Sequence, residues 1–210
     1  MAKKQYARFN LEKSLQGKGY RRIAGVDEVG RGCLAGPVCA AAVVLDAGVK
    51  LTGVRDSKLL TANARERFYS EIVASSDWSV SEVSAGRIDQ LNIQQASLLA
   101  MRKAVMGLSI SPDYVIIDGS CVPELPFPQQ PIIGGDRKCV SIAAASIVAK
   151  VTRDRLMMAL HKGDPRYGFD RHKGYPTAVH LDALEMFGYS EVHRRSFRPR
   201  RLFNRASGNN

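Results

Sequence analysis

The chain has 210 residues, of which 45% are hydrophobic and 24% are charged, and its formal net charge is +11. These values are typical of a soluble globular protein with an apolar core, and the positive balance favours a polyanionic partner. No apolar run approaches the roughly 18 residues of a membrane helix, and the charged start of the chain lacks the apolar segment of a secretory signal, so we expect a cytoplasmic protein without membrane contact.

The first third of the chain predicts two strands and a helix, and a third strand follows. Ile23–Asp27 and Pro37–Leu45 are apolar runs separated by glycines, which favours two antiparallel neighbouring strands. Thr61 can cap a helix over Ala62–Ala74, because apolar residues recur on one face of that segment. Trp78–Ser84 alternates apolar and polar residues imperfectly, and we expect a third strand there.

The middle of the chain predicts two helices, a strand and a loop. Ile93–Leu108 carries apolar residues at helical intervals, and Tyr114–Asp118 is a short apolar strand that ends on an acidic residue. Pro123–Pro131 contains four prolines and is expected to be a loop. A long alanine-rich helix is expected over Ile142–Leu160, entered through Ser141.

Helices are expected in the last part of the chain. Pro176 can occupy the first turn of a helix that ends before Gly188, and Ser190 can cap one last short helix. Strands and helices in this order predict the α/β class, with a mixed sheet on which helices pack. We expect one domain over residues 1–210, with residues 201–210 as a disordered polar tail.

The basic residues are concentrated near the two ends of the chain. Residues 1–22 hold seven Lys or Arg and one Glu, residues 193–210 hold six Arg and no acidic residue, and the part between is close to neutral. Two basic arms can bind nucleic acid, but solvated tails have the same composition. Charge alone therefore leaves both interpretations open.

The four cysteines show neither C-x-x-C spacing nor histidine partners at the intervals of a zinc site. We expect buried thiols and assign them no chemistry. They are Cys33, Cys39, Cys121 and Cys139.

Acidic residues follow β-prone segments at three places. Asp27 and Glu28 end the first predicted strand, and Asp118 and Asp136 end later ones. Carboxylates gathered beside an apolar core repel one another unless a divalent ion neutralises them, and such hard oxygen ligands suit Mg²⁺ or Mn²⁺. Strand-end aspartates also commonly cap turns and helices. The acidic residues alone leave these two interpretations level.

The segments around these acids closely resemble the signature of the type HII ribonucleases H. The similar segments are collinear and span roughly residues 20–200, which we expect to be the catalytic core. Each segment alone is a weak signal, but their common order makes coincidence a poor explanation. In chain order they are Gly25–Gly32, Leu34–Val38, Arg55–Lys58, Ile117–Gly119, Gly135-Asp136, Ser141–Arg155, His172–Thr177 and His193–Phe197.

The resemblance implies a ribonuclease H-like fold, in which helices flank a central mixed five-stranded sheet and the C-terminal part is helical. It also implies a catalytic metal site formed by Asp27, Glu28, Asp118 and Asp136, which would hold two Mg²⁺ or Mn²⁺ ions. The implied enzyme is an endonuclease that hydrolyses the RNA strand of RNA/DNA hybrids. It would also incise 5′ to ribonucleotides embedded in duplex DNA, leaving 5′-phosphate and 3′-hydroxyl ends. Asp154 is better explained as an acid on a helix surface.

Gly30, Arg31 and Gly32 form a segment that could recognise RNA. Glycine lets the backbone approach a sugar closely, so that backbone polar groups can bond the 2′-hydroxyl that distinguishes RNA from DNA. An ordinary tight turn uses the same residues. The family resemblance favours the recognition of RNA.

Further residues are expected to contact the nucleic acid. The resemblance implies that Tyr175 packs on the nucleotide after the scissile phosphate and helps to select an RNA-to-DNA junction, whereas without the motif a half-buried core tyrosine would be the better interpretation. Lys58 and Lys173 are candidate phosphate contacts, and so is Lys150, although isolated lysines are usually solvated.

Three other functions compete with this one. A non-catalytic nucleic-acid-binding module would favour lysines and aromatic residues over gathered acids. Another nuclease of the same fold would share the acids, but a type HIII enzyme typically has an N-terminal domain, and a resolvase or transposase would lack the Gly-Arg-Gly segment. A nucleotide-binding α/β domain is disfavoured because no phosphate-loop motif occurs. We expect a monomer that acts on RNA/DNA hybrids and on DNA duplexes containing ribonucleotides.

Overall fold

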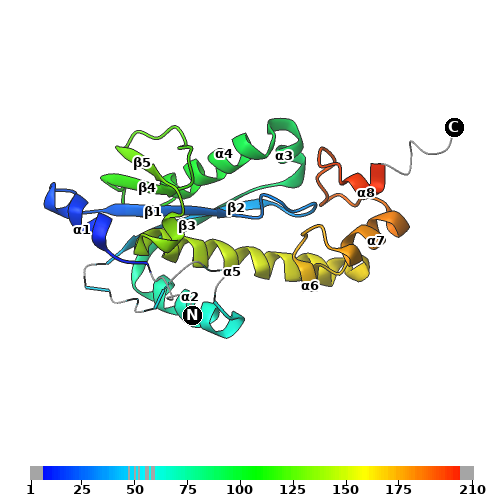
Figure 1. Cartoon of the computed structure of the whole chain (residues 1–210), viewed down its shortest axis with the longest axis horizontal. Coiled ribbons are helices and arrows are strands. Elements are labelled where there is room, and N and C mark those ends of the chain that lie inside the picture. The colour runs from blue at the N-terminus through cyan, green and yellow to red at the C-terminus, as the bar shows by residue number, and fades with distance from the viewer. Residues whose placement is uncertain are drawn as a thin grey trace, which may run out of the picture.

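The computed structural model describes residues 7–46, 48–49, 51, 53–54, 57 and 60–203. A central sheet lies between two layers of helices, and the last helices lie beyond one end of the sheet (Figure 1). The strands are β1 (Ile23–Val29), β2 (Val38–Leu45), β3 (Ser76–Val83), β4 (Tyr114–Asp118) and β5 (Gln129–Ile132). The α-helices are α1 (Asn10–Gly17), α2 (Ala62–Ala74), α3 (Ala85–Leu91), α4 (Ile93–Met106), α5 (Val140–Gly163), α6 (Phe169–His172), α7 (Ala178–Phe187) and α8 (Arg200–Phe203), and the short 3₁₀ helices include η2 (Gly135–Arg137) and η3 (Pro165–Tyr167).

The sheet has five strands in the order β3-β2-β1-β4-β5. β2 pairs antiparallel with β1 and with β3, as the glycines before β2 predicted for the first pair. β4 runs parallel to β1 and to β5. The predicted α/β class with a mixed five-stranded sheet is therefore confirmed, and β1 lies at its centre.

Both faces of the sheet are buried. On β2, Ala40 and Ala42 belong to the core formed with α4, whereas Ala41 and Val43 belong to the core formed with α5 and α2. Successive side chains of a strand point to opposite faces, so the two cores alternate along β2. Because helices cover both faces, β2 is a continuous apolar run rather than an alternating one.

The start of α5 lies directly against β1. A Cβ atom on Gly25 would lie only 2.2 Å from the carbonyl carbon of Ser141, so only glycine permits this approach. The contact places the first half of α5 beneath the residues that follow Gly25 on β1. This position determines which α5 side chains reach the acidic residues.

Most predicted elements are confirmed, and the differences lie mainly at element ends. The helix over Ala62–Ala74 has the predicted bounds and the predicted cap, Thr61. The prediction that Pro123–Pro131 is entirely loop is wrong at its end, because β5 includes Pro131. β5 is at the edge of the sheet, where a residue without an N–H is tolerated.

Three predictions about helix ends are wrong. α5 starts one residue before Ser141, and its N-cap residue is Cys139. α7 is capped by Thr177, so Pro176 precedes the helix instead of starting it. Ser190 starts no helix, because turns and an isolated bridge follow it. Helices α1, α3 and α6 were not predicted.

The end of the chain and the cysteines also differ in part from expectation. The expected disordered tail begins within α8, and residues 204–210 lie outside the described residues. The predicted burial of thiols is confirmed at three cysteines and wrong for Cys121, which is exposed. That the whole chain is one domain stays a prediction. Among the helices of the described segments, none has the length and apolar character needed to cross a membrane.

Candidate active site

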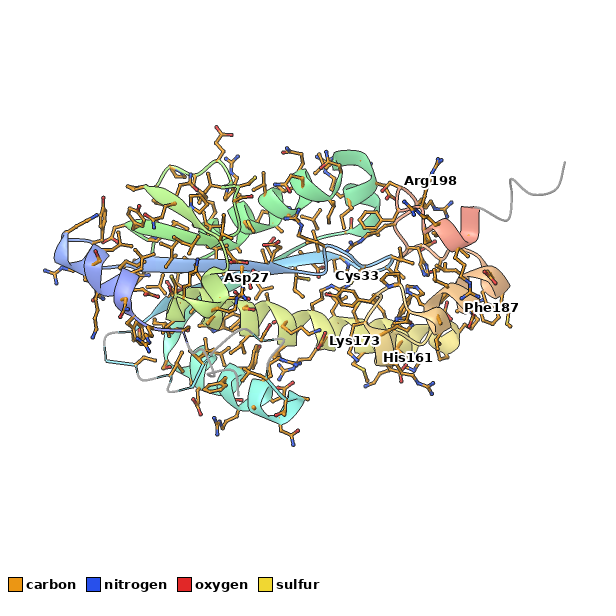
Figure 2. The ribbon with its side chains drawn as sticks, viewed as in Figure 1. Asp27, Cys33, His161, Lys173, Phe187 and Arg198 are labelled. Carbon is orange, nitrogen blue, oxygen red and sulfur yellow. The ribbon has the colours of Figure 1, made fainter. Side chains whose placement is uncertain are left out.

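Two parallel strands bring acidic residues together near the middle of the molecule. β1 and β4 are neighbours, and Val26 is paired with Ile117. The next residues on the two strands are Asp27 and Asp118, which therefore come to the same level of the sheet. Figure 2 places Asp27 in the central part of the molecule, with Glu28 following it on β1.

Asp27 is buried, with 6% of its surface exposed. Burial raises the pKa of its carboxyl group well above the ordinary value, and the negative charges of Glu28 and Asp118 raise it further. Its Oδ1 accepts a hydrogen bond from the Glu28 N–H at 2.7 Å, and a hydrogen bond with Ser146 on α5 favours the ionised form. An ionised Asp27 is therefore costly without a nearby cation.

Glu28 has one paired and one unpaired oxygen. Burial raises the pKa of its carboxyl group, Arg31 lowers it, and the charge of Asp118 raises it. Arg31 Nη1 lies 3.3 Å from Glu28 Oε1. Glu28 Oε2 is buried and has no hydrogen-bond partner among the described residues. A buried oxygen in this state is a suitable ligand for a cation.

A hydrogen bond joins Asp118 to the turn that carries Asp136. Asp118 Oδ1 accepts a hydrogen bond from the N–H of Gly135 at 2.6 Å, which fixes the turn one residue before Asp136. Gly134 adopts a left-handed conformation with φ of 65°, so glycine suits this turn. Asp136 is 7% exposed, and its Oδ1 lies 3.8 Å from Nε of Arg137.

The type of side chain at this site suits a divalent cation, although the described side chains are not already spaced as metal ligands. Glu28 and Asp118 line one pocket of about 130 Å³, together with Arg31 and Gln94. No group of three or more His, Cys, Asp or Glu residues in the described ranges is already spaced as a set of metal ligands. The donors are carboxylate oxygens, and the charge of Asp118 raises the pKa of both Asp27 and Glu28. Hard cations such as Mg²⁺ and Mn²⁺ prefer this type of ligand.

The Gly-Arg-Gly segment forms a turn between β1 and β2. Gly30 has φ of +91°, and a Cβ atom there would lie 2.3 Å from Nε of Arg153, so this glycine is required by the fold. A Cβ atom on Gly32 would meet no atom within 4 Å, so packing does not require this glycine. Arg31 is exposed and donates from Nη2 to Oε1 of Gln94 at 2.7 Å.

The segment that contains Tyr175 lies against the same turn. The Leu34 N–H donates to the Gly174 carbonyl at 2.8 Å, and Tyr175 hydrogen-bonds the thiol of Cys33. Tyr175 is 36% exposed and therefore accessible to a ligand. Lys173 has φ of 52°, and its ammonium group donates to the carbonyl of Asp170. Figure 2 shows Cys33 and Lys173 on the side of Asp27 that faces the C-terminal helices.

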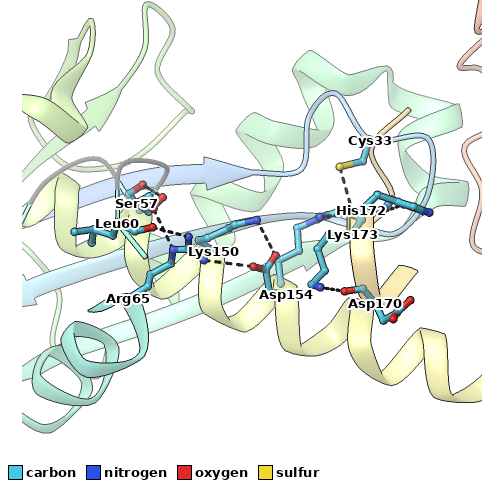
Figure 3. Close-up of polar contacts among 12 residues, drawn as sticks. Cys33, Ser57, Leu60, Arg65, Lys150, Asp154, Asp170, His172 and Lys173 are labelled. Carbon is cyan, nitrogen blue, oxygen red and sulfur yellow. Dashed lines mark hydrogen bonds and ion pairs between the residues drawn. The ribbon is translucent and has the colours of Figure 1, made fainter. Parts of the chain in front are cut away.

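Lys58 lies outside the described residues, but its neighbour Ser57 is described. Ser57 Oγ is 2.9 Å from Oγ of Ser146, and the Ser57 carbonyl accepts a hydrogen bond from Nε of Arg65 at 3.0 Å (Figure 3). Arg65 also pairs with Asp154, whose other partner is Lys150 Nζ at 2.8 Å. Asp154 and Lys150 thus form an ion pair on α5 that reaches Ser57 through Arg65.

Several buried polar residues near these segments were missed by sequence reasoning. Arg153 is completely buried, and its guanidinium donates only to backbone carbonyl groups among the described residues. His172, His180 and His193 form a buried cluster of rings behind Tyr175. No spacing in the sequence shows that these three histidines meet, because they come from different elements.

The mixed sheet and the acidic residues on its central strands define a ribonuclease H-like hydrolase. The model of the ribonuclease HII family matches residues 24–200, so the chain belongs to that family. It is therefore a metal-dependent ribonuclease H, and its family supports endonucleolytic cleavage of the RNA strand of RNA/DNA hybrids. This membership favours the enzyme over the binding module and the nucleotide-binding domain.

Individual relatives agree with this assignment. The chain is 53% identical to ribonuclease HII of Nitrosococcus oceani over 184 residues, which is 87% of this chain and 92% of that protein. It is also 53% identical to ribonuclease HII of Ruegeria pomeroyi, covering 90% of this chain and 82% of that protein. Among solved structures, ribonuclease H2 of Pyrococcus horikoshii superposes with a TM-score of 0.74 at 26% identity, covering 90% of this chain and all of that one.

Proposed function

We propose that the protein cuts DNA duplexes 5′ to an embedded ribonucleotide as well as the RNA strand of hybrids. We further propose that Asp27, Glu28, Asp118 and Asp136 hold two Mg²⁺ or Mn²⁺ ions. When bound, such ions provide Lewis-acid stabilisation of the phosphate and an activated water, and the products are 5′-phosphate and 3′-hydroxyl ends. A solved type HIII structure with Mn²⁺, 20% identical to this chain, shares the fold.

One observation carries the metal proposal. The carboxyl groups of Asp27 and Glu28 are buried, and the charge of Asp118 raises the pKa of both. Glu28 Oε2 lacks a partner within the described structure, although burying such an atom alone is costly. A bound divalent ion would relieve both costs at once. The acids are therefore better explained as ligands than as caps.

Substrate recognition is proposed for the two segments beside the acids. The open space at Gly32 leaves room for a sugar against the backbone, and the exposed guanidinium of Arg31 can bind a phosphate. Tyr175 offers a partly exposed ring for the next nucleotide. Lys173 and Lys58 are the proposed phosphate contacts. The protein is proposed to act as a monomer in the cytoplasm.

The test is cleavage of an end-labelled DNA duplex that contains one ribonucleotide, with Mg²⁺, with Mn²⁺ and with chelator. An RNA/DNA hybrid, an all-DNA duplex and the Asp118→Asn variant are the controls. The proposal predicts one metal-dependent cut 5′ to the ribonucleotide, which is absent from the variant and the all-DNA duplex. Cleavage of the hybrid alone would overturn the proposed incision, and cleavage of the all-DNA duplex would support a resolvase-like nuclease instead.

A further inference from the structure

We propose that Arg153 is a positioning residue that holds the Gly-Arg-Gly turn and the Tyr175 segment together as one recognition unit. The inference rests on the proposed function, because it concerns how the enzyme selects an embedded ribonucleotide. Arg153 belongs to α5, whereas the two segments are far apart in the sequence and come from different parts of the fold.

The guanidinium of Arg153 bonds both the stretch between the Gly-Arg-Gly turn and β2 and the segment that contains Tyr175. Its Nε donates to the carbonyl of Pro37 at 2.9 Å, and its Nη2 donates to the carbonyl of Ala35 at 3.1 Å. Its Nη1 donates to the carbonyl of Lys173 at 2.9 Å, two residues before Tyr175. A planar fork holds its donors at fixed, separated positions that fit three carbonyl groups in this way, whereas the three donors of an ammonium group all radiate from one atom.

Two glycines make room for this bridge. A Cβ atom on Gly30 would lie 2.3 Å from Nε of Arg153, so the turn presses directly on the guanidinium. A Cβ atom on Gly174 would lie 2.5 Å from the carbonyl oxygen of Ala35, so the two segments also press on each other. Both glycines also have positive φ, of +91° and +87°. The close contacts and the backbone conformation therefore both favour glycine at these two positions.

The burial of Arg153 argues against a role in helix stability alone. Its side chain is 0% exposed, and none of the ion pairs found within the described ranges includes it. Burial of a charged group against carbonyl groups costs desolvation free energy, whereas an apolar residue would fill the same space without that cost. The specific gain is the fixed distance between the turn that faces the 2′-hydroxyl and the tyrosine that faces the next nucleotide.

The consequence concerns selectivity. If the two segments are rigidly coupled, only a substrate with RNA at one position and DNA at the next satisfies both. A long RNA/DNA hybrid presents a 2′-hydroxyl at every step, so it can bind in many registers and depends less on the coupling. Loss of Arg153 should therefore reduce cleavage of the single-ribonucleotide duplex more than cleavage of the hybrid.

The experiment compares kcat/KM on the two substrates for wild-type protein and the Arg153→Lys variant, which keeps the charge but loses the fork. We expect the ratio of kcat/KM on the single-ribonucleotide duplex to kcat/KM on the hybrid to fall about tenfold in the variant, which corresponds to about 1.4 kcal/mol. The fall should come mainly from a higher KM for the single-ribonucleotide duplex. Arg155→Lys is the matched control on the same helix, because Arg155 is exposed and bonds Glu66. Its ratio should equal that of wild-type protein.

A double-mutant cycle separates positioning from general destabilisation. Because Arg153 acts through the Tyr175 segment, Arg153→Lys should add little to the loss of selectivity caused by Tyr175→Ala. Equal losses on both substrates, or losses that simply add, would overturn the inference. If Arg153→Lys does not fold, Gly174→Ala decides, since it forces the same segments apart without changing Arg153, and an unchanged ratio would then contradict the inference.

The outcome also distinguishes this inference from the function on which it rests. If wild-type protein leaves the single-ribonucleotide duplex intact, the proposed function fails and the positioning role fails with it. If wild-type protein cuts that duplex and both Arg153→Lys and Gly174→Ala keep the wild-type ratio, only the positioning role is wrong.

Discussion

At the scale of single residues, we expect the metal-free protein to become more stable when the negative charge of the acidic cluster, formed by Asp27, Glu28 and Asp118, is reduced. Asp118→Asn removes a charge that raises the pKa of both Asp27 and Glu28. We expect metal-free variant protein to be more stable than wild-type protein by about 1 kcal/mol, because one like-charge repulsion is lost. Thermal unfolding without metal measures this, and a lower Tm for the variant would contradict it.

The same variant should respond less to metal. Wild-type Tm should rise on addition of Mg²⁺ or Mn²⁺, because an ion that binds only the folded state stabilises it. The rise should be smaller in Asp118→Asn, and its cleavage rate should fall roughly 100-fold or more. Asp154→Asn is the control, since this acid is paired with Lys150 on α5 and is not among the groups that shift the pKa of Asp27 or Glu28. An equal rise in both variants would argue against Asp118 as a ligand.

Two glycines of one turn should behave differently when a methyl group is added. Gly30→Ala should destabilise the protein by about 2 kcal/mol, because its Cβ meets Arg153 and its φ is positive. Gly32→Ala should leave stability unchanged, because its Cβ meets nothing within 4 Å. If the turn binds the 2′-hydroxyl, Gly32→Ala should still reduce cleavage about tenfold or more. Urea unfolding and kinetics on one preparation test both, and full activity of Gly32→Ala would favour an ordinary turn.

At the scale of elements, α5 receives its N-terminal cap from a distant helix. Its N-cap residue, Cys139, makes no side-chain cap. Instead, Glu12 on α1 accepts hydrogen bonds from the N–H and the hydroxyl of Ser141, at 3.0 and 2.9 Å. A carboxylate at this position satisfies a free N–H and interacts favourably with the helix dipole.

Glu12→Ala should therefore destabilise the protein by about 1–2 kcal/mol, the usual cost of losing a helix cap. Urea unfolding at neutral pH measures the loss. Glu71→Ala on α2 is the control. Glu71 is exposed, and among the described residues its carboxylate pairs only with Arg67 on the same helix, an interaction of little weight. Equal stability of the two variants would show that Glu12 does not cap α5.

The elements that were predicted and those that were missed differ in a physical way. β1, β2 and β4 are largely apolar runs in the middle of the sheet, so their pattern alone predicts them. β5 was missed because its proline reads as loop, and only its place at the sheet edge makes it tolerable. The start of α5 was misplaced because its cap, Glu12, is remote in sequence, and no local pattern contains that information.

At the scale of the whole molecule, two histidines connect α7 and the residues after it with the Tyr175 segment. The Ser190 N–H donates to Nδ1 of His193, so the proton of a neutral His193 is on Nε2 and points to Nε2 of His180 at 3.1 Å. The proton of His180 is then on Nδ1 and is donated to the carbonyl of Tyr175 at 2.9 Å. This series of hydrogen bonds requires the rings of both His180 and His193 to be neutral.

Acid should therefore weaken the fold. Burial lowers the pKa of both His180 and His193 to about 4, whereas unfolded histidine titrates near 6.5. The unfolded chain binds more protons between these values, so the free energy of unfolding should fall as pH decreases from about 6.5 to about 4, by on the order of 2 kcal/mol. Urea unfolding across this range measures the loss. His193→Gln should reduce it relative to His161→Gln, and identical pH profiles would refute the assignment.

The candidate site could be predicted from sequence only in part, for a reason visible at this scale. The position of each acid after a β-prone segment left metal binding and capping level, and the family resemblance then favoured the metal site. The strand register shows how Asp27 and Asp118 meet. Arg153 and the histidines were not identified, because their partners are backbone carbonyls and rings that only the completed fold brings close. Residue type and spacing indicate chemistry at strand ends, but they carry no signal for bonds to a distant main chain.

Arg194, far along the chain, helps to hold the Gly-Arg-Gly turn between β1 and β2 in place. Arg194 donates from Nη1 to the carbonyl of Arg31 at 2.8 Å and from Nε and Nη2 to that of Gly36, while Ala35 and His193 form an isolated bridge. During synthesis the Gly-Arg-Gly turn leaves the ribosome before Arg194, which follows Arg31 by 163 residues. A nascent chain therefore carries its acids and its turn before Arg194 can hold that turn in place.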